Sequence, residues 1–126
     1  MITSDWTDDQ PIYRQLRDKV VNAIIDGDLK EGEPLPSVRA IAVDLQINPI
    51  TASKAYQELV AEDLVEKRRG LGMFIIEGAR GKVLSNERRR FLEEDWPRIL
   101  ERIDSLGIDP QDLLATSAEK TGGRNE

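Results

Sequence analysis

The sequence predicts a mainly α-helical fold that contains one small β-hairpin. The first observation is a pair of short apolar-periodic segments in residues 37–63, separated by a tight break. The second is a glycine-containing hairpin pattern that follows this pair directly. The third is a broad apolar stripe in the C-terminal third of the chain. Together they predict a winged helix-turn-helix followed by two C-terminal dimerisation helices.

Composition excludes several classes of function. The chain has 126 residues, enough for one domain or one domain with an extension, and it contains no cysteine and no histidine. Disulfides, thiolate chemistry, zinc ribbons and imidazole acid–base catalysis are therefore excluded. No carboxylate run has the spacing of a magnesium or calcium loop, so we expect neither a metal nor a cofactor.

Charge and hydropathy indicate a soluble protein. No apolar run approaches the roughly 18 residues that a membrane span requires, and the N-terminus lacks the pattern of a signal peptide. We expect a cytoplasmic protein with no membrane partner. The net charge of −6 opposes binding to nucleic acid, but a local basic edge can still hold a phosphate backbone. We expect that such binding depends strongly on salt.

Residues 1–9 form a polar arm whose one large apolar residue, Trp6, is expected to pack against the body. A first helix should begin near Pro11 and end at Gly27, which suits the left-handed position after a helix. Its apolar face consists of Tyr13, Leu16, Val20, Ala23 and Ile24. We expect this helix to serve as a scaffold for a three-helix unit.

Pro34 and Pro36 should hold the following loop extended. Ser37 then stands where its hydroxyl can cap a second helix. The apolar stripe of that helix consists of Val38, Ile41, Ala42 and Leu45.

The third helix should begin with Asn48 as cap and Pro49 at its first position, where a missing N–H costs nothing. Only Gln46 and Ile47 remain for the turn, so the two helices must cross steeply, as in a helix-turn-helix. The predicted buried face consists of Ala52, Ala55, Tyr56, Leu59 and Val60. In this motif the N-terminal turn of the second helix enters the DNA major groove. Here that turn carries Ile50, Thr51, Ser53 and Lys54.

Residues 64–76, LVEKRRGLGMFII, predict a β-hairpin whose turn lies at Gly70 and Gly72. A hairpin directly after a helix-turn-helix is the wing of a winged helix. Basic residues next to the glycines would meet phosphate or the minor groove. These residues are Lys67, Arg68 and Arg69. The alternative is that they only solubilise an edge strand.

We place a domain boundary near residue 78, which separates a DNA-binding domain (1–78) from a short helical dimerisation tail (79–126), because glycines at Gly78 and Gly81 break the pattern. Pro97 should kink or restart the helix that follows. The apolar stripe of the tail consists of Leu84, Phe91, Leu92, Trp96, Ile99, Leu100, Ile103 and Leu106. The adjacent Arg88, Arg89 and Arg90 either form a solvated face or extend a DNA footprint.

Asp109 and Pro110 repeat the pattern of a cap followed by proline and predict a short last helix. That helix would contain Leu113, Leu114 and Ala118, followed by a disordered end at residues 120–126. Two such helices cannot enclose a core alone. Burial of large apolar side chains against a partner is stabilising, and a two-fold homodimer is the commonest symmetric assembly that achieves it.

With these features, the chain resembles the GntR family of bacterial transcription regulators. The resemblance covers about residues 10–76 and runs from PIYRQLRDKVVNAIIDGDLKEGEPLPSVRAIAVDL to NPITASKAYQELVAEDLVEKRRGLGMFI. The N-P-x-T-x-x-K-A-Y pattern and the short tail resemble the YtrA subfamily. This resemblance implies dimerisation through the C-terminal helices, no large effector domain and control of ABC-transporter genes.

The resemblance also implies roles for single residues. Arg39 matches the family arginine that holds DNA, and Thr51 matches a threonine that contacts phosphate or base. Arg69, Gly70 and Gly72 match the arginine and the glycines of the wing.

The chain departs from many family members on the recognition helix. It has Pro49 and Ser53 where they carry arginines, so Arg39 becomes the strongest candidate for base recognition and Lys54 remains a second. Against these interpretations, Arg39 could pair with Asp44, and Lys54 could be a solvated lysine.

Three functions compete at this point. The first is a homodimeric regulator, expected to be a repressor, that binds double-stranded DNA at a palindromic operator. The second is a winged helix that serves as a protein–protein interaction module. The third, an enzyme like the aminotransferase fusions of a related subfamily, is rejected because the chain has no room for that domain. A small-molecule effector could bind between winged helix and tail, but the sequence names none.

Overall fold

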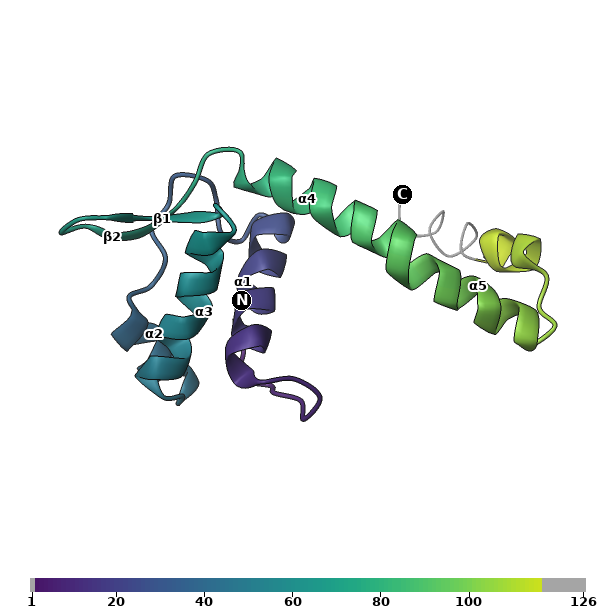
Figure 1. Ribbon diagram of the computed structural model, residues 1–126, viewed down its shortest axis with the longest axis horizontal. Helices are drawn as coiled ribbons and strands as arrows, with labels where there is room; N and C mark the ends of the chain where they lie inside the picture. The colour runs from purple at the N-terminus through teal and green to yellow at the C-terminus, as the bar shows by residue number, and fades with distance from the viewer. Residues whose placement is uncertain (1, 117–126) are drawn as a thin grey trace. The chain divides into compact units, whose positions relative to one another are not determined.

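The computed structural model describes residues 2–116 and confirms the predicted fold class (Figure 1). The elements are α1 (Ile12–Asp26), α2 (Val38–Leu45), α3 (Pro49–Ala61), β1 (Val65–Arg68), β2 (Gly72–Ile75), α4 (Ala79–Arg90), the π-helical segment η1 (Phe91–Asp95) and α5 (Trp96–Ser105). Residues 110–116 form a further helical segment. The chain divides into two compact units, one up to residue 86 and one from residue 87.

The core of the first unit lies where α3 packs against α1 and α2. Figure 1 shows α1 and α3 side by side. The most deeply buried large side chains are Leu16, Val20, Ile24, Tyr56, Leu59, Val65 and Ile75. The predicted apolar faces of the three helices are therefore confirmed, with Tyr13, Val38 and Val60 only partly buried at the edge of the core.

Each predicted helix end of this unit is present. The Ser37 hydroxyl accepts a hydrogen bond from the Ala40 N–H at 3.0 Å. The left-handed residue after α1 is Gly27, with φ of 83°. The turn between α2 and α3 uses a second left-handed residue, Gln46, with φ of 55°.

An ion pair ties α1 to the C-terminal end of α3. The Arg17 guanidinium donates two hydrogen bonds to the Glu62 carboxylate, one of them from Nε at 2.9 Å, and a third to Asp18 at 2.8 Å. The hydrogen bond that Arg17 donates to Glu62 is the main reason why the pKa of Arg17 is raised. Because this geometry is bidentate, it fixes the orientation of the two helices as well as their distance.

A third backbone segment, which the sequence did not predict, pairs with the two strands of the hairpin. β1 and β2 are antiparallel, with Val65 opposite Ile75 and Arg68 opposite Gly72. The loop before α2 lies along the other edge of β2, where the Leu35 N–H donates to the Met73 carbonyl at 2.8 Å. Gly32 donates in the same way to the carbonyl of Ile75 at 2.8 Å. The proline-rich loop is extended, as predicted, and its pairing anchors the wing to the body.

The N-terminal arm is attached to α1 by the buried side chain of Gln15, which exchanges hydrogen bonds of 2.9 Å with the backbone of Thr7. Lys19 adds an ion pair of 2.8 Å with Asp5. This hydrogen bond, with a second one from Thr3, lowers the pKa of Asp5 to about 2. Trp6 packs against the core, as predicted.

Only one of the two glycines that were expected to break the pattern lies outside a helix. Gly78, with φ of 87°, ends the hairpin region, but Gly81 lies inside α4 and breaks nothing. Glu31 explains why the helix begins here, because its carboxylate accepts a hydrogen bond from the Arg80 N–H at 3.1 Å. Hydrogen bonds from the backbone of Gly78 and Arg80 lower the pKa of Glu31. The first turns of α4 belong to the core of the first unit, where Val83 is buried.

Pro97 neither breaks the helix nor leaves it regular. It lies in the first turn of α5, directly after the π-helical turn η1. A proline removes one helical hydrogen bond and its ring crowds the carbonyl four residues earlier, here that of Glu93 in η1. The wider π-helical turn η1 makes room for the proline ring. In this turn the Trp96 N–H donates to the Phe91 carbonyl, five residues earlier.

The last described helical segment begins as predicted, because the Asp109 carboxylate accepts from the Gln111 N–H at 3.0 Å. Ala118 and the predicted disordered end at 120–126 lie outside the described residues. Within residues 2–116, the helices are too short or too polar to cross a membrane.

Candidate nucleic-acid interface

The helix-turn-helix is fixed by a hydrogen bond between α3 and the segment before α2. The Tyr56 hydroxyl donates to the Pro36 carbonyl at 2.8 Å. Tyr56 is almost completely buried, and this burial raises its pKa. The start of α2, which carries Arg39, is thereby held against the recognition helix α3.

Arg39 lies exposed on the first turn of α2. Within the part of the chain that the structure describes, its guanidinium has no ion pair and no side-chain hydrogen bond, with Asp44 or with any other residue. Its positive charge and its planar donors are therefore available to an external acceptor. An arginine in this state suits a phosphate or the acceptor edge of a guanine.

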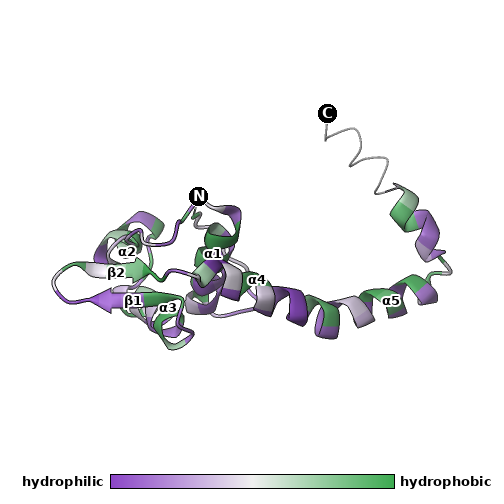
Figure 2. Ribbon diagram, turned by 90° about the horizontal axis from the view of Figure 1, so that it is seen from above, coloured by the Kyte–Doolittle hydropathy of each residue, from purple (hydrophilic) through white to green (hydrophobic). Residues whose placement is uncertain are grey.

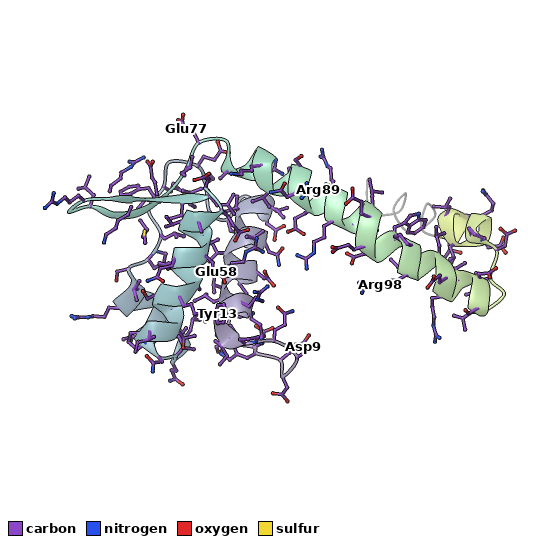
Figure 3. The ribbon with its side chains drawn as sticks, in the orientation of Figure 1. Asp9, Tyr13, Glu58, Glu77, Arg89 and Arg98 are labelled. Atoms are coloured by element: carbon purple, nitrogen blue, oxygen red, sulfur yellow. The ribbon has the colours of Figure 1, made fainter. Side chains whose placement is uncertain are left out.

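The tip of α3 presents mixed chemistry. Ile50 is 76% exposed, whereas Thr51 and Ser53 are half-buried. Lys54 is exposed on α3, but its ammonium lies 4.0 Å from the centre of the Tyr13 ring on α1. Figure 3 labels Tyr13 on α1 beside α3. The sequence left open whether Lys54 contacts DNA or is a solvated lysine, and in the structure its ammonium contacts an aromatic face.

The three basic residues of the wing are not equivalent. Arg68 lies over the Phe74 ring at 4.2 Å and donates to the Glu66 carboxylate at 3.0 Å. Lys67 and Arg69 are exposed, with no ion pair among the described residues. Two of the three cations are therefore free to meet phosphate, and the third is held on the surface of the hairpin.

The predicted glycines form the hairpin turn. Gly70 and Gly72 have φ of 79° and 109°, conformations that residues with a side chain rarely adopt. Leu71, between them, is 71% exposed. Sequence analysis did not select Leu71, although its place between two glycines marks the turn.

A second exposed apolar residue was also missed. Val43 on α2 is 73% exposed, and nothing in its sequence context separates it from the buried positions of a short helix.

The candidate elements lie together. In Figure 1 the tip of the hairpin and α2 are on the same side of α3, and Figure 2 shows the same arrangement from above. The first unit therefore combines an exposed helix tip, an uncompensated arginine and a basic wing.

The second unit presents exposed apolar side chains on its helices, and Figure 2 shows hydrophobic residues recurring along α5 between hydrophilic ones. Phe91 and Trp96 stack with ring centres 6.3 Å apart. Of the predicted dimerisation residues, Ile103 is buried within the chain itself and Leu84 is half-buried. The others are exposed: Phe91, Leu92, Trp96, Ile99, Leu106, Leu113 and Leu114.

Metal ligands are not grouped anywhere in residues 2–116, where no cluster of three or more carboxylates occurs. The site can therefore offer hydrogen-bond donors, positive charge and apolar contact to a ligand.

The family model described as bacterial regulatory proteins, gntR family, matches residues 12–75. The HTH-type transcriptional repressor YtrA of Bacillus subtilis (strain 168) is 36% identical over 128 residues, which cover 98% of each chain. A GntR family transcriptional regulator from Listeria monocytogenes has a similar structure, with a TM-score of 0.76, 26% identity and coverage of 90% of this chain and 98% of that one. YtrA from Sulfolobus acidocaldarius aligns with a TM-score of 0.57 and 32% identity, over 72% of this chain and 96% of that one.

Proposed function

Because this chain belongs to the GntR family of bacterial transcription regulators and is YtrA-like over nearly its whole length, we propose that it is a homodimeric repressor that binds a palindromic operator. Each copy would place the N-terminal turn of α3 in a major groove, while its wing contacts the flanking backbone or minor groove. A protein with this role acts in the cytoplasm.

The observation that carries the DNA-binding part is the state of Arg39. It is exposed at the start of α2, which the Tyr56–Pro36 hydrogen bond holds against α3, and it has no acidic partner among the described residues. Lys67 and Arg69 supply two more uncompensated charges on the wing. In a chain whose net charge is −6, cations left without partners on one side are suited to hold a polyanion.

The exposed apolar side chains of the tail support the homodimer. Large apolar side chains that remain exposed in one chain, such as Leu92 at 62%, stabilise an assembly in which a partner covers them. A two-fold pair is self-complementary and would present two α3 helices with opposite orientation, which requires an inverted repeat with half-sites about 10 base pairs apart or a little more.

Repression is proposed from the relative, and the target genes are proposed from the resemblance to the YtrA subfamily. The similar Bacillus subtilis protein is described as a repressor. We extend that role to this chain and propose ABC-transporter genes as its targets. A small molecule that prefers one spacing of the two copies would change operator affinity.

The proposal is tested by selecting DNA sequences from a random pool at fixed salt, followed by affinity measurements on the enriched sequence. We expect an inverted repeat. The Arg39→Ala variant should bind it about tenfold or more weakly, because one good contact to a base contributes about 1–3 kcal/mol.

A matched control is Arg14→Ala, which removes an exposed arginine from α1 on the opposite side of α3 from α2. Both variants should unfold at the wild-type temperature. Operator affinity that is equal in Arg39→Ala and Arg14→Ala would remove Arg39 from the interface. Failure to enrich any sequence would favour the alternative function, a winged helix that binds protein.

A further inference from the structure

Ile50 is the most exposed large apolar side chain of the first unit among the described residues, at 76%. It lies in the first turn of α3, where the motif approaches DNA bases. An isoleucine exposed to water at that point can contribute favourable binding free energy only by contact with an apolar group, because its side chain has no hydrogen-bonding atom.

Two polar side chains near Ile50 accept hydrogen bonds within the chain. The Asn48 carboxamide accepts a hydrogen bond from the Ile50 N–H at 2.8 Å and therefore serves as the cap of α3. The Ser53 hydroxyl accepts from Gln57 at 3.4 Å.

The remaining neighbours leave little polar chemistry at the tip. The ammonium of Lys54 lies over Tyr13. Pro49 has no donor, and Thr51 is half-buried. The most exposed large apolar side chain of the α3 tip is therefore the aliphatic chain of Ile50.

Only one base edge in the major groove offers an aliphatic partner, and that is the 5-methyl group of thymine. Cytosine presents an amino donor at the neighbouring position, which would remain unsatisfied against an isoleucine. We propose that Ile50 recognises the 5-methyl group of one thymine in each half-site of the operator. This inference rests on the proposed function and adds the chemical group that the apolar tip recognises.

The experiment uses the full-length protein and the sequence enriched from the random pool. Each thymine of a half-site is replaced in turn by deoxyuridine, which lacks only the methyl group, and affinity is measured at fixed salt. We expect one position where the replacement weakens wild-type binding about fourfold, which corresponds to the burial of one methyl-sized group. In Ile50→Ala that difference between thymine and deoxyuridine should disappear.

Two variants keep the test decisive. Val43→Ala shortens a similarly exposed apolar side chain on α2 and should keep the wild-type discrimination. Ile50→Val retains a branched side chain, so it should show reduced discrimination even if Ile50→Ala binds too weakly to measure. Ile50→Val discrimination equal to that of the wild type would overturn the proposal.

The outcomes also separate this inference from the proposed function. An enriched operator in which no deoxyuridine replacement weakens binding contradicts the methyl contact and leaves operator binding intact. Discrimination that persists in Ile50→Ala means that another side chain recognises the methyl group. Failure to enrich any operator overturns both.

Discussion

The ammonium of Lys54 lies 4.0 Å from the centre of the Tyr13 ring, so the lysine of the recognition helix contacts α1. A cation over an aromatic face contributes about 0.5–1 kcal/mol at an exposed site. The charge of Lys54 therefore stabilises the packing of α1 on α3. Among the residues that the structure describes, Arg39 has no acidic partner, so it remains the uncompensated cation of the helix-turn-helix.

We expect Lys54→Met to lower the free energy of unfolding by about 0.5–1 kcal/mol. Its operator affinity should fall much less than that of Arg39→Ala. Urea unfolding and a DNA titration on the same samples measure both quantities. Tyr13→Phe keeps the aromatic ring and is the matched control, with stability close to wild type. A loss of operator affinity in Lys54→Met as large as in Arg39→Ala would show that the lysine leaves the ring to contact DNA.

The wing should show unequal contributions from neighbouring arginines. Arg69→Gln removes an exposed cation without an acidic partner, so the slope of log affinity against log salt should decrease by about one. Arg68→Gln removes a cation that is bound to Glu66 and Phe74, and the slope should change less. Titrations at several salt concentrations measure the slopes. Equal slopes for the two variants would mean that Arg68 leaves the hairpin surface when DNA binds.

Tyr56 should make stability depend on alkaline pH. Burial raises its pKa above the ordinary value of 10.0, so the phenol stays protonated in the folded protein when it ionises in the unfolded chain. Its contribution to stability is complete below pH 10 and is lost as pH rises above that value. The wild type should therefore lose more stability than Tyr56→Phe between about pH 8 and about pH 11.

The same variant has an effect at neutral pH. Tyr56→Phe removes the hydrogen bond to the Pro36 carbonyl and should cost about 1 kcal/mol of stability. Urea unfolding at each pH measures both effects. An identical pH dependence in wild type and Tyr56→Phe would show that another group causes the alkaline loss.

The exposed face of the tail gives a prediction about assembly. Leu92→Glu places a charge at a position that is 62% exposed in one chain, so the fold of that chain should be unchanged. A charge buried between two copies without a partner is costly, so the dimer should dissociate at concentrations where the wild type is dimeric. Sedimentation measures the mass. Arg89→Glu, at an exposed position of α4, is the control and should remain dimeric.

Local rules were sufficient to predict the first three helices of the first unit. Ser37 and Asn48 mark the starts of α2 and α3, and the spacing of apolar residues identifies the buried faces. The pairing of Leu35 with Met73 was not predictable, because it joins residues far apart in the sequence whose side-chain pattern does not record backbone hydrogen bonds. Glu31 was missed as the cap of α4 for the same reason.

The tail shows where two local rules compete. Gly81 is an unfavourable helix residue, but the cap from Glu31 and the burial of Val83 outweigh that preference. Pro97 was predicted to disturb the helix. The π-helical turn that accommodates it could not be predicted from helix propensities.

For the candidate site, the sequence identified the basic and glycine residues of the helix-turn-helix and the wing. The family resemblance ranked Arg39 above Lys54 and singled out Arg69 of the wing, but the residue pattern gave no physical reason for either distinction. That distinction depends on which side chains find partners in space, such as Phe74 for Arg68 and Tyr13 for Lys54.

The most direct test of two copies acting on one operator is the mass of the saturated protein–DNA complex, measured by light scattering on the enriched duplex. We expect two chains per duplex for the wild type, and Leu92→Glu should need a much higher concentration to reach the same mass. One chain per duplex at saturation, or equal behaviour of the wild type and Leu92→Glu, would contradict the account.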